Sequence, residues 1–298
     1  MGENAPLLSI VTPVYNRAEL IKVCWKSLKE QSCRDFEWIV VDDGSTDGTG
    51  DTVRHFPSAG FPLILVEKQN GGKHTALNAA IPHIRGRYVL ILDSDDRLVP
   101  TAVEQIREGW ARYDGEKQVG IVTFLKGRSV DDPSCTAPEE HIPVDIMRYR
   151  RNCIHSSDCC EVIRGELFRK YPFPVFDGEK FLSEGALWNR VSFTHRCVYI
   201  NRVIYLAEYL EGGLTKSGRS LRIRNPRGGM YTANLNMHSK NFRDRRLKNG
   251  LLFTCYGFFA GLTGREMARR CDHKGLMWLC LPGGWLLYHY WKRKYGVG

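Results

Sequence analysis

Residues 88–96 read YVLILDSDD, and this stretch decides how the rest of the chain is interpreted. Its first five residues are continuously apolar, which is typical of a strand that is covered on both faces of a parallel sheet. Three carboxylates follow within four residues, those of Asp93, Asp95 and Asp96. Such a cluster is costly after a buried strand unless a cation or hydrogen-bond donors compensate it. Residues that follow a strand lie at the ligand-binding edge of an open α/β sheet, so we favour a binding role over a solvated acidic loop.

Outward from this stretch, strand-like and helix-like segments alternate over the first hundred residues. Short β-rich runs occupy residues 8–12, 37–41 and 63–67, and segments with helical spacing follow each of them. This alternation predicts βαβ units, and therefore an α/β fold with a mostly parallel central sheet flanked by helices. A further helix is expected at residues 100–113 and a further strand at residues 120–124.

Two polar turns follow the first two predicted strands. After the first strand come Pro13, Val14 and Tyr15, where the aromatic ring could stack on a base or simply pack in a tight turn. After the second strand come Asp42 and Asp43, which could accept hydrogen bonds from a base N–H and a ribose hydroxyl. An Asx turn and helix cap explain the residues after this pair, but not two like charges side by side.

A glycine-rich turn follows the third predicted strand and opens a helix. Gly72 and Lys73 offer backbone N–H groups and a positive charge, which suit a phosphate. The turn has neither the dinucleotide-binding glycine pattern nor a P-loop. After the fourth strand, Asp93 and Asp95 lie two residues apart, so both carboxylates could face one ligand. Mg²⁺ or Mn²⁺ would suit their oxygen atoms and would share them with substrate phosphates.

The four motifs PVYN, VVDDGSTD, NGGKHTALNAA and YVLILDSDD occur in this order over residues 7–100. Together they resemble the nucleotide-binding half of the family-2 inverting glycosyltransferases, which act in bacterial polysaccharide and cell-surface glycan biosynthesis. The resemblance implies a GT-A fold, which is Rossmann-like. It also implies a nucleoside diphosphate sugar donor, with UDP preferred, and a divalent metal, Mn²⁺ or Mg²⁺. Asp93-Ser94-Asp95 matches the DXD motif of that family.

The resemblance also assigns roles to individual residues. It implies that Tyr15 and Asp43 hold the base, that Asp93 lies on the ribose side and that Asp95 binds the metal. Asn78 matches the second residue of the Arg-Asn pair that is usual in the family, but a leucine replaces the arginine. Lys73 is expected to take over the phosphate contact of that arginine.

The second half of the chain carries weaker signals. Members of this family place an acidic catalytic base at the start of a helix, and Glu184 in the run FLSEGALW is the best match. A helix-terminal charge favoured by the dipole is the alternative for Glu184. We expect a glycine- and arginine-rich loop at residues 212–229. The predicted domains are a catalytic domain at 1–235, with nucleotide-binding (1–100) and acceptor (101–235) halves, and an amphipathic helical tail at 236–298.

The positive charge of the chain is concentrated in this tail. Residues 236–298 contain 12 Lys and Arg and 3 Asp and Glu, a net +9 of the total of +10. Apolar and aromatic residues beside these cations favour a membrane surface over nucleic acid, because no RNA-binding signature accompanies them. The longest apolar runs are too short for a membrane-spanning helix. Without a recognisable signal peptide, we expect a cytoplasmic protein that is peripheral on the cytoplasmic face of the membrane. The helices of the tail are expected to be interrupted at Pro282.

Together these features predict transfer of a sugar from a nucleotide sugar to a membrane-associated glycan or glycolipid acceptor. The processive relatives carry transmembrane helices and a Gln-x-x-Arg-Trp motif, and their absence here predicts a single transfer per encounter. Two alternatives remain open at this point. One is a nucleotidyltransferase, which would release pyrophosphate. The other is a non-catalytic nucleotide-sugar-binding or scaffold subunit.

Overall fold

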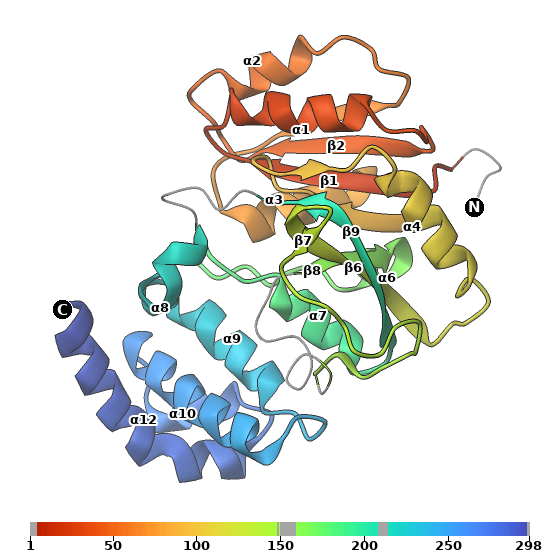
Figure 1. Ribbon diagram of the computed structural model, residues 1–298. Helices are drawn as coiled ribbons and strands as arrows, with labels where there is room; N and C mark the ends of the chain where they lie inside the picture. Colours follow the sequence, from red (N-terminus) through yellow and green to blue (C-terminus); the bar gives the residue numbers. More distant parts are fainter. Residues whose placement is uncertain (1–4, 148, 150–158, 208–213, 297–298) are drawn as a thin grey trace. The chain divides into compact units, whose positions relative to one another are not determined.

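The computed structural model describes residues 5–147, 149, 159–207 and 214–296 (Figure 1). The chain forms two compact units. The first comprises Met1–Phe173 with Thr194–Tyr209, and the second comprises Pro174–Phe193 with Leu210–Gly298. The units divide the chain at other points than the predicted boundary at residue 235. The reason is that residues 174–193 and 214–235 belong to one compact unit with the helices of the tail, in which α9 (Pro226–Asn236) packs against α10 (Arg243–Phe259).

The first unit is built on a mixed sheet of nine described strands in the order β3-β2-β1-β4-β8-β6-β9-β5, with β7 paired to β6. The four strands β3, β2, β1 and β4 are mutually parallel, as the alternation predicts. β8 then joins antiparallel between β4 and β6. The strands are β1 (Leu8–Val14), β2 (Phe36–Asp42), β3 (Leu63–Glu67), β4 (Tyr88–Ile91), β5 (Arg97–Leu98), β6 (Val119–Ser129), β7 (Asp132–Pro133), β8 (Cys159–Arg164) and β9 (Arg196–Leu206).

The register of the parallel strands brings the predicted motifs to one edge of the sheet. Val14 of β1 pairs with Asp42 of β2, and Asp42 pairs with Glu67 of β3. On the other side of β1, Val11 pairs with Ile91 of β4. The polar turns that follow these four strands therefore lie side by side at their carboxyl ends.

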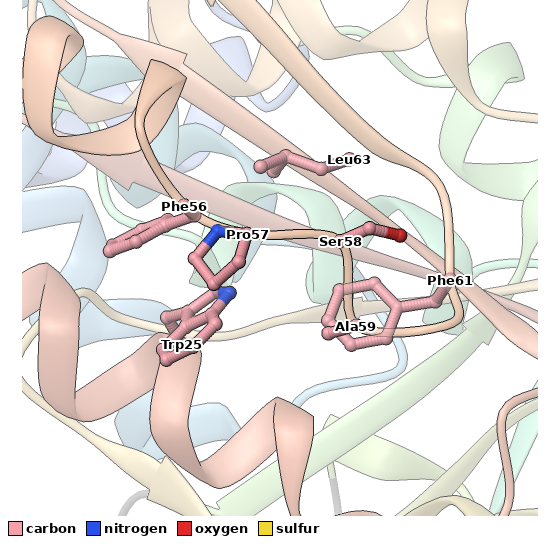
Figure 2. Close-up of a pocket in the computed structure, with 7 residues that line it drawn as sticks. All are labelled: Trp25, Phe56, Pro57, Ser58, Ala59, Phe61 and Leu63. Atoms are coloured by element: carbon pink, nitrogen blue, oxygen red, sulfur yellow. The ribbon is translucent and has the colours of Figure 1, made fainter.

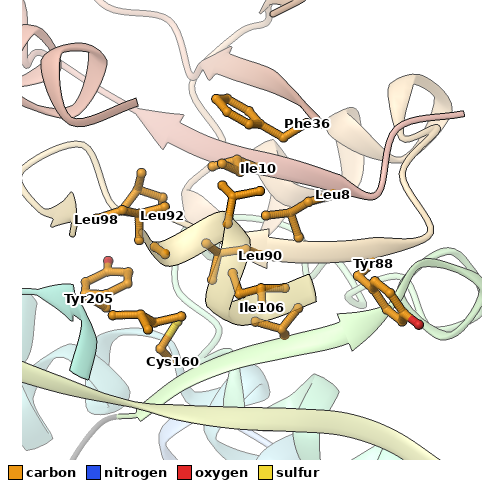
Figure 3. Packing of buried hydrophobic residues seen from close by; sticks show 14 of the residues in the cluster. Leu8, Ile10, Phe36, Tyr88, Leu90, Leu92, Leu98, Ile106, Cys160 and Tyr205 are labelled. Carbon is orange, nitrogen blue, oxygen red and sulfur yellow. The ribbon is translucent and has the colours of Figure 1, made fainter. Parts of the chain in front are cut away.

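Helices cover this sheet, and a large apolar core lies against it. Alternate residues of β1, β2 and β4, such as Leu8, Ile10 and Leu90, are completely or almost completely buried, and Figure 3 shows them packed with Tyr205 of β9 and Ile106. Burial on this scale anchors the strand ends that carry the polar turns. The helices are α1 (Leu20–Lys29), α2 (Thr49–Arg54), α3 (Lys73–Ala80), the short 3₁₀ helix η1 (Ile81–His83), α4 (Ala102–Ala111) and α6 (Gly165–Lys170).

The second unit is helical, and two of its helices lie where a loop was expected at residues 212–229. That expectation was wrong for the described part of the segment. The buried carboxylate of Glu179 accepts hydrogen bonds from the backbone N–H groups of Arg227 (2.7 Å) and Gly228 (2.8 Å), which caps the helix from a distant part of the chain. The helices are α7 (Gly185–Ser192), α8 (Leu214–Arg224), α9 (Pro226–Asn236), α10 (Arg243–Phe259), α11 (Gly264–Arg269) and α12 (Lys274–Tyr295).

The tail is helical as predicted, but α12 runs through Pro282 without the expected interruption. Gly284, two residues further on, lies so close to α10 that a Cβ atom built there would be 1.9 Å from Oγ1 of Thr254. The same hydroxyl donates a hydrogen bond to the carbonyl of Cys280 (3.3 Å). Contacts with α10 thus lie on both sides of the proline, and α12 continues through it. Among the described helices, none combines the length and the apolar character that a membrane crossing requires.

Candidate active site

The turn after β4 is held by a tyrosine from a distant strand. The backbone N–H of Asp93 donates to the Tyr205 hydroxyl (3.0 Å), and that hydroxyl donates to a carboxylate oxygen of Asp96 (2.7 Å). The turn is closed by the N–H of Asp96, which donates to the carbonyl of Asp93 (3.1 Å). Tyr205 is fully buried on β9. One phenol thus fixes both ends of the Asp93–Asp96 turn.

Two lysines counter the negative charge of this turn. Lys73, the first residue of α3, forms an ion pair with Asp93, and the ammonium of Lys126 lies 4.1 Å from the centre of the Tyr205 ring. Burial would raise the pKa of the Asp93 carboxyl, but the charges of Lys73 and Lys126 outweigh it, so the pKa is lowered. Asp93 is therefore a stable carboxylate.

Asp96 and Tyr205 have the opposite tendency. Burial raises the pKa of Asp96 to about 6, and the negative charges of Asp93 and Asp95 add to the rise, although the hydrogen bond from Tyr205 opposes it. Burial beside the same carboxylates raises the pKa of Tyr205 well above its usual value. The phenol consequently stays protonated and continues to donate to Asp96.

Asp95 differs from both neighbouring carboxylates. It is partly exposed, and no other described residue forms a hydrogen bond or an ion pair with it. A free carboxylate at this edge has the oxygen chemistry that Mg²⁺ and Mn²⁺ prefer. The described residues hold no group of three or more His, Cys, Asp or Glu side chains arranged as a metal site. A cation at Asp95 would thus depend on further oxygen ligands, which a diphosphate can provide.

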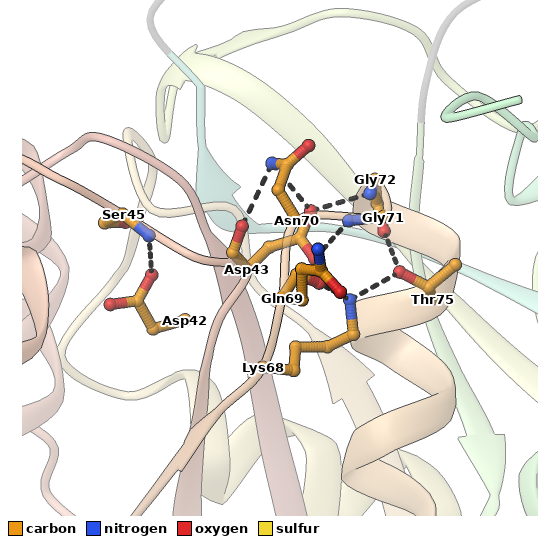
Figure 4. A network of polar contacts seen from close by, with 9 residues as sticks. All are labelled: Asp42, Asp43, Ser45, Lys68, Gln69, Asn70, Gly71, Gly72 and Thr75. Atoms are coloured by element: carbon orange, nitrogen blue, oxygen red, sulfur yellow. Dashed lines mark hydrogen bonds and ion pairs between the residues drawn. The ribbon is translucent and has the colours of Figure 1, made fainter. Parts of the chain in front are cut away.

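The second predicted acidic residue, Asp43, is enclosed by hydrogen-bond donors, as Figure 4 shows. One carboxylate oxygen accepts from Lys68 (2.6 Å) and the backbone N–H of Gly71 (2.9 Å), and the other from Gly72 N–H (2.7 Å) and the Asn70 amide (3.2 Å). A carboxylate has about four such acceptor positions. Asp43 and Gly72, both predicted to contact the donor, therefore satisfy each other here, and their contacts with a nucleotide sugar stay predictions.

The turn after β1 is tied to the turn after β2. The N–H of Asp43 donates to the carbonyl of Val14 (2.8 Å), and the N–H of Thr46 donates to the side-chain oxygen of Asn16 (2.8 Å). Asn16 has a positive φ of 51°, a conformation that asparagine tolerates better than most residues. This turn follows Pro13 and Val14 and leaves the ring of Tyr15 47% exposed, available for stacking. Among the described residues, the carboxylate of Asp42 accepts one hydrogen bond, from the N–H of Ser45 (2.9 Å).

Of the remaining predicted residues, Ser94 is buried within the turn after β4, and the other two lie elsewhere. Both amide atoms of Asn78 pair with the backbone of Phe173, each at 2.8 Å, so its side chain joins α3 to the segment after α6. Glu184 is the residue before α7 in the second unit, where it is partly exposed and its carbonyl accepts from Leu187 N–H (2.8 Å). The catalytic role of Glu184 and the donor contact of Asn78 stay predictions.

Sequence reasoning missed the residues that support the site. Tyr205, Lys68 and Lys126 come from strand and loop positions that carry no motif. The sequence indicates these supporting residues only indirectly. Buried carboxylates such as Asp43 and Asp96 require hydrogen-bond donors, and lysine and tyrosine side chains can supply them.

A separate hollow lies on the first unit, away from these turns. Figure 2 shows its lining, in which Trp25 of α1 and Phe56 stack with ring centres 5.0 Å apart. Its volume is about 280 Å³, and none of the residues predicted for the donor lines it. The hollow is therefore not the predicted donor site.

The sequence profile described as Glycosyl transferase family 2 matches residues 9–171, which include the whole row of turns described above. The chain belongs to this family. It is also 30% identical over 221 residues to glycosyltransferase GlyA of Streptococcus pneumoniae, a match that covers 70% of this chain and 31% of GlyA. The chain thus spans less than a third of that relative.

Solved structures confirm the GT-A fold of this family 2 glycosyltransferase. TarS 1–349 of Staphylococcus aureus, in complex with UDP-GlcNAc, matches with a TM-score of 0.64 and 20% identity over 93% of this chain and 80% of that chain. The mannosyltransferase PcManGT of Pyrobaculum calidifontis, in complex with GDP-Man and Mn²⁺, matches with a TM-score of 0.55 and 21% identity over 97% of this chain and 84% of that chain.

Proposed function

We propose that this family 2 glycosyltransferase uses a divalent cation to transfer a sugar from a nucleoside diphosphate sugar, preferably a UDP-sugar, to an acceptor hydroxyl, with inversion of configuration. The observation that carries the proposal is the free carboxylate of Asp95, next to an Asp93 carboxylate that Lys73 already neutralises. The UDP-GlcNAc bound to TarS supports a UDP-sugar, and the GDP-Man and Mn²⁺ bound to PcManGT support a nucleoside diphosphate sugar and a divalent metal.

The turns at the sheet edge have distinct tasks in this proposal. Tyr15 stacks on the base, and the Asp43 network keeps the turn before α3 in one conformation. Asp95 holds the cation, which neutralises the leaving diphosphate when bound. Lys73 brings a second positive charge to the same edge and can exchange its partner Asp93 for a phosphate oxygen. These positive charges stabilise the leaving group. The proposed mechanism needs no covalent sugar–enzyme intermediate.

Glu184 is assigned the role of general base in this mechanism. A partly exposed carboxylate at the start of α7 can accept the proton of an acceptor hydroxyl, which then attacks the anomeric carbon from the face opposite the diphosphate. One displacement of this kind inverts the anomeric configuration. The acceptor proposed is a glycan or glycolipid at the cytoplasmic face of a membrane, on which the protein is peripheral, because the tail is strongly basic.

Substitution of the proposed base tests the mechanism. In Glu184→Gln, sugar transfer should fall by roughly 100-fold or more, because the amide cannot take up the proton, whereas donor binding measured by calorimetry should be unchanged. The matched control is Glu166→Gln, which removes a carboxylate from the first turn of α6. Wild-type transfer by Glu184→Gln would remove this residue from the role. NMR of the first product should show the anomeric configuration opposite to that of the donor.

A further inference from the structure

One side of α12 exposes large apolar side chains to solvent. Trp278 is 47% exposed, Leu279 72%, Trp285 49%, Leu286 63% and Tyr290 58%. Their spacing of one, seven, eight and twelve residues from Trp278 places them on one side of a helix with 3.6 residues per turn. We call this set the α12 outer face. Most described large apolar side chains of the chain are buried, so this concentration on one helix face marks an interaction surface.

The opposite side of the same helix is already packed. Met277, Cys280, Gly284 and Trp291 are buried, and the ring of Trp291 lies 5.9 Å from that of Tyr256 on α10. The helix therefore has an inner apolar side that completes the core of the second unit, and a second apolar side that this core does not use. Rotation of α12 cannot bury the outer face without exposing the inner one.

The charges around the outer face indicate what covers it. Lys274 stands at the first turn of α12 and Lys292, Arg293 and Lys294 at the last, and the helix contains no Asp or Glu. Trp and Tyr side chains flanked by Lys and Arg are typical of helices that lie in the headgroup region of a bilayer. Anionic lipids match this charge. A second copy of the chain, paired through the same face, would bring cations against cations.

We propose that the α12 outer face lies in the surface of an anionic lipid bilayer, with Trp278, Trp285 and Leu286 at the level of the headgroups. This inference identifies the surface by which the protein contacts the membrane that holds the acceptor, and in that respect it rests on the proposed function. α12 does not cross the bilayer, since among the described residues no helix meets the requirements for spanning. The cations at both ends of α12 set its preference for anionic lipid.

Vesicle co-flotation tests the contact directly. The wild-type protein should float with phosphatidylcholine vesicles that contain phosphatidylglycerol, and at least tenfold less with phosphatidylcholine alone. In the double variant Leu279→Gln/Leu286→Gln, the apparent affinity for the anionic vesicles should fall at least tenfold. The matched control is Val130→Gln/Ile142→Gln, which removes two apolar side chains of similar exposure from the first unit and should float like the wild type.

Three results would overturn this inference. They are no flotation of the wild type, equal loss in both double variants, and a lipid-free dimer that only the α12 variant abolishes, because the face would then bind a second copy. A midpoint of thermal unfolding equal to that of the wild type would show that each variant is folded. Binding of the nucleotide-sugar donor in lipid-free buffer, measured by calorimetry, should be the same for the wild type and the α12 variant. Loss of flotation with normal donor binding thus concerns the surface, whereas the absence of donor binding in the wild type itself concerns the proposed function.

Discussion

The Tyr205 hydroxyl connects one backbone group and one side-chain group of the turn that carries Asp95. In Tyr205→Phe, the N–H of Asp93 and the buried carboxylate of Asp96 each lose a partner, so unfolding free energy should fall by about 1–3 kcal/mol. The turn should also loosen, so the Mn²⁺ concentration required for half-maximal transfer should rise, with a smaller change in the maximal rate. Tyr113→Phe, which loses a hydroxyl bonded to His141, is the control and should leave the metal requirement unchanged. An unchanged metal requirement in Tyr205→Phe would show that the phenol is only structural.

Asp42 and Asp43 are adjacent, but their carboxylates should differ in importance. Asp43→Asn replaces an acceptor of four hydrogen bonds by a group with one oxygen, and should lower the unfolding free energy by about 2 kcal/mol or more. Asp42→Asn keeps an oxygen for the N–H of Ser45 and should cost about 1 kcal/mol or less. Urea denaturation of both variants compares them. Equal losses would contradict the account of the Asp43 network.

Which of these residues could be predicted follows from how each one is held. Asp93, Asp95, Asp42 and Asp43 stand next to continuously apolar strands, so their place at one sheet edge follows from local pattern and sheet geometry. Local pattern contains no information on partners across the fold. It could not show that Asp43 binds the turn of Gly72, which lies 29 residues away.

At the scale of elements, α10 and α12 approach closely because of their glycines. In Gly284→Ala, the new methyl group would overlap Thr254, and the unfolding free energy should fall by about 1–3 kcal/mol. Gly275→Ala lies in the same helix with no atom near the added Cβ, so it should be neutral or stabilising by up to about 1 kcal/mol. Thermal denaturation measures both. A stable Gly284→Ala variant would show that the two helices are not in contact at this glycine.

The elements themselves differ in how far the sequence predicts them. The apolar strands β1, β2 and β4 are continuous in pattern and are therefore visible locally. The helix α9 is not, because its glycine-rich first turn is capped by Glu179, which lies 49 residues before Gly228. The predicted interruption at Pro282 was wrong for the same reason, because the contact of Gly284 with Thr254 is a tertiary contact that local sequence does not show.

At the scale of the whole molecule, the four parallel strands of a mixed sheet present four polar turns at one edge, and β9 supplies the tyrosine that fixes one of them. The order of the later strands was not predictable, because β8 lies antiparallel between β4 and β6 although it follows both of them in the chain. The division into a nucleotide-binding half, an acceptor half and a tail stays a proposal, and the second compact unit contains both Glu184 and the tail.

The central claim is metal-dependent sugar transfer with Asp95 as a ligand of the cation. The most direct measurement is nucleoside diphosphate release from a panel of nucleotide sugars in the presence of membrane lipid extract, with Mn²⁺ or Mg²⁺ and with EDTA, for the wild type and for Asp95→Ala. We predict release from one donor by the wild type with metal, its loss in EDTA, and a decrease of roughly 100-fold or more in Asp95→Ala at equal metal concentration. Release of pyrophosphate instead, release that persists in EDTA, or wild-type rates in Asp95→Ala would contradict the account.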